Sequence, residues 1–204
     1  PAPSVPTSRR LDPVVRHQVA RTAVGRFQPR HVYGIMRPDR RRLELASLKH
    51  RQTVKLADTN VLKRKDITRE LLLMWISRPE GFAFKAGQYC TIGLDGIERA
   101  YSIASAPHEQ LLELFVELVP YPEGVLTPEL WKLNVGDSIT VRPRAKGIFT
   151  LKSTARRHLL ISTVTGIVPY VSFLRDYFHG DLNGHQFYVL QGASYHDEFA
   201  YDNE

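Results

Sequence analysis

The sequence has one cysteine, Cys90, and no run of about 18 consecutive apolar residues. An intrachain disulfide is therefore excluded, and no transmembrane helix is expected. A lone cysteine fits a reducing compartment, so we expect a cytoplasmic protein. Because Cys90 lies within a strand-like pattern, we interpret it as a small buried hydrophobic residue rather than a nucleophile.

Two common catalytic patterns are also missing. The eight histidines form neither H-x-x-x-H nor H-E-x-x-H, so the sequence predicts no metal site. No G-x-S-x-G occurs, which removes the main argument from sequence for a serine hydrolase. The sequence therefore supports neither a metal site nor a serine hydrolase.

Acidic residues are scarce only at the start of the chain. Residues 1–52 hold 12 Lys and Arg against 3 Asp and Glu, whereas residues 53–204 hold 16 against 18. With six prolines and no sustained period, residues 1–52 are predicted to be a flexible extension. It could be a plain tail, an arm for an acidic partner, RNA or anionic lipid, or an organelle transit peptide, although serines are few. The near-neutral remainder argues against a specific nucleic-acid-binding core. The sequence opens at Pro1 and stops after Glu204 without a helix-ending signal, so we expect a fragment or processed form.

From Thr53 onward, short alternating segments predict a small antiparallel β-barrel over residues 53–153. Five or more strands are expected within TVKLADTNVLKRKDITRELLLMWISRP, FAFKAGQYCTIGL, RAYSIAS, LLELFVELV and DSITVRPRA. In RAYSIAS, Arg99 and Tyr101 are expected on one face of the strand and Ala100 and Ser102 on the other. In LLELFVELV, Leu112, Leu114, Val116 and Leu118 are expected on one face, with Glu113, Phe115 and Glu117 on the other.

Residues 154–204 change to a strand–helix–strand pattern. The apolar run RHLLISTVTG ends in a glycine, and IVPYVSFLRDYFHG is a helical pattern with Pro169 near its start and Gly180 just past its end. HQFYVLQGAS is a second apolar strand, and YHDEFAYDNE predicts the beginning of another helix. Two buried-type strands around a helix predict a parallel βαβ unit, the opening of a doubly wound nucleotide-binding domain.

Three short motifs, in order along the chain, offer groups that could bind a ligand. RAYS offers a guanidinium and an aromatic ring on one strand, and PEGVLTPELW offers Thr127 as a helix N-cap after free backbone amides. STVTGIVPY places Gly166 at a strand–helix turn, where a ligand can approach the backbone. Each motif alone also fits an ordinary surface feature. Their order, on a barrel followed by βαβ, is more specific.

The chain resembles the ferredoxin–NADP⁺ reductase family, particularly its bacterial type, over about residues 54–204. The matching segments are FKAGQY, RAYSIASAP, EGVLTPEL followed by VGD, KGIFTL and TGIVPYVSFL. The resemblance implies a six-stranded antiparallel FAD-binding β-barrel followed by a Rossmann-like parallel α/β domain for NADP(H). That domain is expected to be incomplete here, because it needs several further strands.

The resemblance also implies roles for individual residues. Arg99 would pair with the FAD pyrophosphate, Tyr101 would stack on the isoalloxazine ring and Ser102 would hydrogen-bond near its reactive nitrogen, so Tyr101 and Ser102 are the catalytic candidates. The FAD-binding candidates are Arg99, Ala100, Tyr101, Ser102, Phe115, Val116, Glu117, Leu118, Val125, Leu126, Thr127 and Thr165. The NAD(P)-binding candidates are Thr163, Gly166, Ala193 and Ser194.

Two positions depart from the family pattern. Val164 stands where the family has a glycine that lets pyrophosphate approach the main chain. Ser194 stands where bacterial members often have an arginine that binds the 2′-phosphate of NADP. The choice between NADPH and NADH therefore stays open.

The function implied by the resemblance is an FAD-dependent oxidoreductase. It would move hydride between NAD(P)H and the flavin, and single electrons to or from ferredoxin or flavodoxin docked on Lys146, Arg142 and Arg144. The expected cofactors are FAD and NADP(H) or NAD(H), and the expected state is a monomer. Two alternatives stay open: the reductase component of an oxygenase, and a flavin-binding module without turnover.

Overall fold

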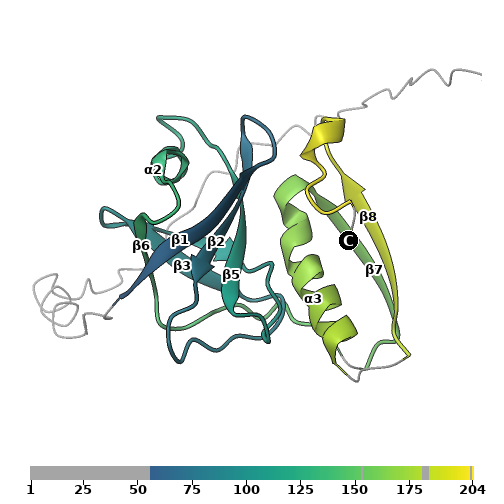
Figure 1. The fold of residues 1–204 in the computed structure, drawn as a ribbon. Helices are drawn as coiled ribbons and strands as arrows, with labels where there is room; N and C mark the ends of the chain where they lie inside the picture. The colour runs from purple at the N-terminus through teal and green to yellow at the C-terminus, as the bar shows by residue number, and fades with distance from the viewer. Residues whose placement is uncertain (1–55, 153, 181–183, 203) are drawn as a thin grey trace, which may run out of the picture. The chain divides into compact units, whose positions relative to one another are not determined.

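The computed structural model describes residues 56–204 except 153, 181–183 and 203, so the predicted extension over residues 1–52 lies outside the described residues. Figure 1 shows the course of the chain by colour. The strands are β1 (Ala57–Asp66), β2 (Leu71–Ser77), β3 (Tyr89–Leu94), β4 (Ile97–Ser102), β5 (Leu111–Glu117), β6 (Ser138–Val141), β7 (Arg157–Thr163) and β8 (Gln186–Gly192). The α-helices are α2 (Thr127–Lys132) and α3 (Val168–His179), with 3-10 helices at Val164–Ile167 and His196–Glu198.

The first six strands form an antiparallel sheet in the order β4-β3-β6-β1-β2-β5. Just after β4, the amide of Ala104 donates to the carbonyl of Glu113 in β5 at 2.8 Å, which brings the two edges of the sheet together. The sheet is therefore a nearly closed barrel, and the prediction of a six-stranded antiparallel barrel is confirmed.

The alternation in β5 and β6 explains the barrel core. Leu112, Leu114 and Val116 of β5 are fully buried, together with Ile139 and Val141 of β6, in one apolar cluster. Burying each such side chain contributes about 1.5–3 kcal/mol. On the opposite face of β5, Glu113 and Phe115 are buried as well, and Phe115 packs with residues of the α/β part.

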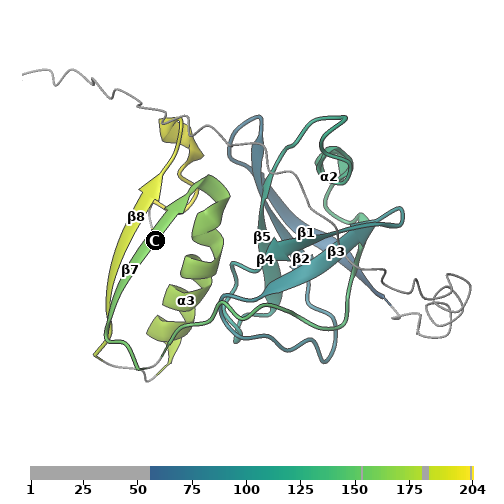
Figure 2. The ribbon, with the colours of Figure 1, turned by 180° about the vertical axis from the view of Figure 1, so that it is seen from behind.

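The last part of the described chain is a parallel βαβ unit. Strands β7 and β8 pair in parallel and are joined through α3, which has a proline in its first turn and ends at Gly180 as the C-cap. In both Figure 1 and Figure 2, α3 lies between the barrel and the β7–β8 sheet. Val168 and Val171 of this helix pack in a second apolar cluster with Leu73 and Phe115 of the barrel. No described helix is long and apolar enough to span a membrane.

The prediction that a helix begins in YHDEFAYDNE is wrong. The structure has only a three-residue 3-10 helix, His196–Glu198. The Glu198 carboxylate accepts hydrogen bonds from the amides of Ser194 and Tyr195 at 2.7 and 3.1 Å, and Phe199 is already extended. The turn is therefore capped at its start and broken one residue after its end.

Candidate functional site

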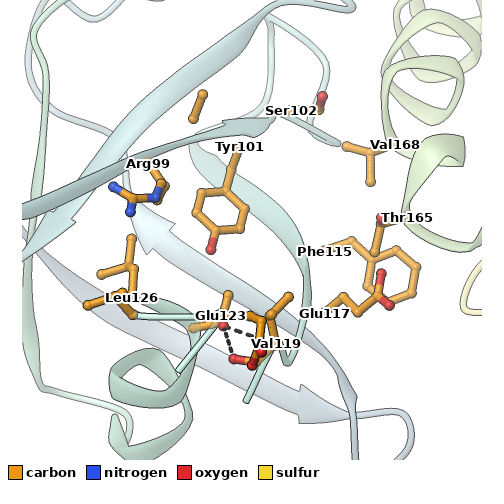
Figure 3. A pocket seen from close by; sticks show the side chains of 14 residues that line it. Arg99, Tyr101, Ser102, Phe115, Glu117, Val119, Glu123, Leu126, Thr165 and Val168 are labelled. Carbon is orange, nitrogen blue, oxygen red and sulfur yellow. Dashed lines mark hydrogen bonds between the residues drawn. The ribbon is translucent and has the colours of Figure 1, made fainter. Parts of the chain in front are cut away.

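A cavity of about 430 Å³ lies where the barrel, the loop before α2 and the start of α3 meet. Figure 3 shows the side chains around it. The lining residues are Arg99, Ala100, Tyr101, Ser102, Phe115, Glu117, Val119, Glu123, Gly124, Val125, Leu126, Thr127, Thr165 and Val168. All three predicted motifs contribute to this one cavity.

Strand β4 places a cation and an aromatic ring side by side. Arg99 and Tyr101 project from the same side of β4, as their spacing predicts (Figure 3). Arg99 is exposed, has no ion pair with any described residue, and donates from its guanidinium to the carbonyl of Glu98 at 2.8 Å. Tyr101 is half-buried, and this burial raises the pKa of its hydroxyl to about 12. At neutral pH, the tyrosine is therefore an uncharged ring and donor.

The loop before α2 folds back onto the end of β5. A Cβ at Gly124 would lie 1.8 Å from the carbonyl oxygen of Val119, so only glycine fits this close approach. The Thr127 hydroxyl donates to the Val119 carbonyl at 2.9 Å and accepts from the Val119 amide at 3.0 Å. The prediction that Thr127 is the N-cap is wrong, because its hydroxyl is engaged with Val119 and Leu126 takes the N-cap position.

Two backbone amides in this loop remain available. The amides of Val125 and Leu126 bond to none of the described residues, and both residues line the cavity. Together with Arg99 they make one end of the cavity attractive to an anion. Two carboxylates, those of Glu117 and Glu123, also line the cavity and are acceptors for hydroxyl groups.

The other end of the cavity is formed by Phe115 of the barrel and by Thr165 and Val168 of the α/β part (Figure 3). Thr165 follows Val164, whose φ of 38° lies in the left-handed region that a β-branched residue rarely adopts. This backbone conformation is one that glycine adopts easily, which fits the glycine that the family has in place of Val164. The same conformation turns the chain from β7 into α3.

The remaining predicted residues lie outside the cavity. The Val116 side chain is in the barrel core, and Leu118 is not a lining residue. The NAD(P) candidates lie together at the carboxyl ends of β7 and β8, where Thr163 pairs with Gly192; they are Thr163, Gly166, Ala193 and Ser194. These four residues are not among those that line the cavity, although Thr163 and Gly166 flank Thr165, which does line it.

Four lining residues are not among the candidates named from the sequence: Val119, Glu123, Gly124 and Val168. Gly124 carried a signal, because a glycine before a helix start marks a tight turn. Val119 and Glu123 lie in the segment VPYPEG, whose looping course depends on the contact between Thr127 and Val119. Val168 faces the cavity only because α3 packs against the barrel.

The basic side chains predicted for partner docking are not equivalent. The Arg142 guanidinium forms a two-point ion pair with the Glu98 carboxylate, with Nη2–Oε2 at 2.6 Å and Nε–Oε1 at 3.0 Å. That hydrogen bond lowers the pKa of Glu98. Arg144 and Lys146 are exposed. Within the described ranges, no three His, Cys, Asp or Glu side chains are grouped to hold a metal ion.

Comparison with known proteins shows that the chain is similar to ferredoxin–NADP reductases. No protein-family model matches the chain. It is 36% identical over 125 residues to ferredoxin–NADP reductase A of Sorangium cellulosum, covering 58% of this chain and 44% of the relative. It is 31% identical over 151 residues to the flavodoxin/ferredoxin–NADP reductase of Buchnera aphidicola subsp. Baizongia pistaciae, covering 71% of this chain and 59% of the relative.

A solved structure supports the same likeness. A ferredoxin NADP⁺ reductase from Neisseria gonorrhoeae with bound FAD and NADP matches with a TM-score of 0.65 and 28% identity, covering 71% of this chain and 60% of that chain. Phthalate dioxygenase reductase matches with a TM-score of 0.58 at 21% identity, a likeness of fold alone. The chain spans about half the length of the curated relatives it matches.

Proposed function

Because the chain is homologous to the ferredoxin–NADP reductases in sequence and fold, we propose that it is an FAD-dependent oxidoreductase. It moves hydride between NAD(P)H and the flavin, and single electrons to or from ferredoxin or flavodoxin. The observation that carries the proposal is the single cavity shared by Arg99, Tyr101, the amides of Val125 and Leu126, and Thr165.

The residues present fit FAD. The guanidinium of Arg99, which forms no ion pair with a described residue, and the free amides of Val125 and Leu126 suit a diphosphate. The neutral ring of Tyr101 offers a flat surface for the isoalloxazine. When bound, FAD supplies the redox chemistry, and the protein binds it, orients it and sets its surroundings.

Individual residues then have distinct tasks. Arg99 holds negative charge at one end of the cavity, and Tyr101 keeps the ring system from rotating. Ser102 presents a hydroxyl beside that ring, and Thr165 marks the side from which a nicotinamide arrives. The carboxylates of Glu117 and Glu123 accept hydrogen bonds from sugar hydroxyls.

The pyridine nucleotide is proposed to bind at the edge formed by the carboxyl ends of β7 and β8, at Thr163, Gly166, Ala193 and Ser194. Residues 186–204 contain no Lys or Arg that could pair with a 2′-phosphate. Both NADPH and NADH are therefore candidate co-substrates and belong in any test.

The proposed partner is ferredoxin or flavodoxin, met by a monomer in the cytoplasm. Exposed Arg144 and Lys146 support docking of an acidic protein, and the single buried Cys90 suits a reducing compartment. Electron transfer from the reduced protein to ferredoxin should slow as ionic strength rises. A rate that is indifferent to salt would contradict charge-steered docking.

The decisive experiment is anaerobic reduction of the purified full chain loaded with FAD. We expect a yellow protein that retains FAD through gel filtration and is bleached by NADPH or NADH, with dithionite defining complete reduction. Retention of FAD without bleaching by either nucleotide favours the flavin-binding module instead. A chain that does not bind FAD overturns the proposal. The oxygenase-reductase alternative has weaker support, because the sequence relatives are ferredoxin–NADP reductases.

A further inference from the structure

A buried ionic cluster lies beside the cavity and takes no part in the proposed binding of FAD. Glu113 of β5 is 3% exposed, although it is a carboxylate. Its Oε2 accepts from the Arg175 guanidinium of α3 at 2.7 Å, and its Oε1 accepts from the Tyr201 hydroxyl at 2.9 Å. Arg175 also donates to the Glu204 carboxylate through Nη2 at 2.6 Å and Nε at 2.9 Å.

The cluster joins three separate pieces of the chain. Glu113 belongs to the barrel, Arg175 to α3 and Tyr201 to the segment after the last 3-10 helix. The backbone of Glu113 is fixed too: its amide donates to the Ser105 hydroxyl at 2.7 Å, and its carbonyl accepts from Ala104 at 2.8 Å. Every polar group of Glu113 therefore has a partner.

Such a cluster is better suited to fixing geometry than to adding stability. Burying charges costs free energy that their mutual attraction only partly returns, and apolar replacements are often as stable. Ionic hydrogen bonds are directional, however, and hold their elements in one register. Burial, followed by the negative charge of Glu113, raises the pKa of Tyr201, so its hydroxyl stays a donor throughout the neutral range.

The cluster is linked to the cavity by periodicity and packing. Glu113 and Phe115 lie two residues apart on the same face of β5, and Phe115 lines the cavity. Val168 and Arg175 lie seven residues apart, two turns along the same face of α3, and Val168 also lines the cavity. Fixing Arg175 against Glu113 therefore sets the rotation at which α3 presents Val168 to Phe115.

Tyr201 contacts the cavity-lining residue Phe115 directly. Its ring meets Phe115 edge to face, with centroids 5.8 Å apart and an interplanar angle of 87°. The Arg175 guanidinium lies 5.8 Å from the Tyr201 ring centroid. Tyr201 is thus packed between the ion pair and the aromatic side chain at the edge of the site.

We propose that Glu113, Arg175 and Tyr201 are positioning residues that set the spacing between Phe115 and Thr165, and so control how closely a nicotinamide approaches the flavin. The inference rests on the proposed function. Because these residues do not touch the anion-binding end at Arg99, their loss should slow hydride transfer far more than it weakens FAD binding.

The test compares Tyr201→Phe with Tyr177→Phe in the full chain. Tyr201→Phe keeps the ring against Phe115 and removes the hydrogen bond to Glu113. Tyr177→Phe is the matched control, because it removes a hydroxyl from α3 that accepts from the His185 amide at 3.2 Å, away from the cluster. Glu113→Gln is a third variant, which keeps the shape and an acceptor for Tyr201 but loses the charge.

Four quantities are measured: FAD affinity, the limiting rate of single-turnover reduction by NADPH and NADH, the apparent Kd of that reduction, and amide hydrogen exchange at residues 164–168 in the FAD-free chain. We expect Tyr201→Phe to lower the limiting rate at least tenfold and to speed exchange at residues 164–168 at least tenfold. Both dissociation constants should stay within about threefold of wild type. Glu113→Gln should fall between wild type and Tyr201→Phe, and Tyr177→Phe should match wild type.

Two results would overturn the positioning role. One is a folded Tyr201→Phe protein with wild-type exchange and limiting rate. The other is a variant that only loses thermal stability or FAD affinity while its limiting rate is unchanged. A wild-type chain that holds FAD but is not reduced by either nucleotide overturns the proposed function instead, and hydrogen exchange then decides by itself whether Tyr201 holds the 164–168 turn. If Glu113→Gln does not fold, Tyr201→Phe alone decides.

Discussion

Arg99 is the one cation among the residues that line the cavity, and no described carboxylate neutralises it. Replacing it with alanine removes charge-assisted hydrogen bonds to the proposed diphosphate, each contributing about 1.5–3 kcal/mol. We expect Arg99→Ala to weaken FAD binding by about 10- to 100-fold. Fluorescence titration of FAD into the purified chain measures the change.

The matched control is Arg69→Ala. Arg69 is an exposed arginine in the turn between β1 and β2, outside the cavity. Its loss should leave the Kd for FAD within about twofold. Equal effects of the two substitutions would mean that Arg99 contributes only general positive charge.

The buried thiol of Cys90 makes the stability of the folded protein depend on pH. Its thiol is fully buried, and burial raises its pKa from about 9 to about 12. Because the folded state disfavours the thiolate, stability is fully present below pH 9 and is lost as the pH rises from about 9 to about 12. The loss attributable to Cys90 should be about 2 kcal/mol at pH 10.5.

Urea unfolding of wild type and Cys90→Ala across pH 7–10.5 checks this prediction. The stability difference between the two proteins should be constant below about pH 8 and shift in favour of Cys90→Ala above pH 9. A difference that stays flat to pH 10.5 would show that the folded thiol ionises as readily as the unfolded one.

At the scale of elements, the turn between β7 and α3 holds the clearest strained residue. Val164 has φ 38°, and its side chain packs against the second apolar cluster. The left-handed conformation costs an L-residue with a Cβ roughly 1–2 kcal/mol. Substitution with glycine removes that cost together with the valine packing, so comparison with wild type alone mixes two effects.

Comparing Val164→Gly with Val164→Ala separates the two effects, because both lose most of the packing and only alanine keeps the strain. We expect the glycine variant to be more stable by about 1 kcal/mol, the reverse of the usual order. The same pair at Val135, an exposed residue without a positive φ, should show alanine as the more stable. Thermal unfolding of the four variants measures both differences. The same order at both positions would contradict the strain at Val164.

Elements that depend on local pattern could be predicted from sequence, whereas those that depend on distant contacts could not. Alternation located the barrel strands, and Pro169 with Gly180 marked the ends of α3. Thr127 looked like an N-cap, but its hydroxyl binds Val119, eight residues earlier in the chain. Alternation puts Glu113 on the face of β5 opposite the core leucines, but its contacts with Arg175 of α3 and with Tyr201 depend on distant parts of the chain.

The candidate site, too, could be predicted from sequence only in part. The grouping of Arg99 with Tyr101 follows from strand geometry, and their cavity includes Thr165 as expected. Val168 could not be predicted as a lining residue, because its position depends on how α3 packs on the barrel. The assignment of FAD to this cavity came from resemblance to a family, and it stays a proposal that the titrations above test.

On the scale of the whole molecule, the β7–β8 sheet is covered on one face only within the described residues. The face away from α3 carries Leu159 and Ile161 of β7 opposite Tyr188 and Leu190 of β8, in parallel register. All four are between 50% and 66% exposed. A continuous apolar surface of this kind is prone to binding other apolar surfaces.

We therefore expect the 204-residue chain, which we propose is a monomer when dilute, to bind an apolar dye such as ANS in its folded state and to self-associate as its concentration rises. Leu159→Thr combined with Leu190→Thr keeps β-propensity while interrupting the apolar face, and should lower both dye binding and association. Each substitution should change stability by no more than about 0.5 kcal/mol, because neither side chain is buried. Leu62→Thr is the control, since Leu62 is 46% exposed on β1, apart from this face. Loss of folding in the double variant would show instead that this face is covered in solution, so that its side chains contribute to the core.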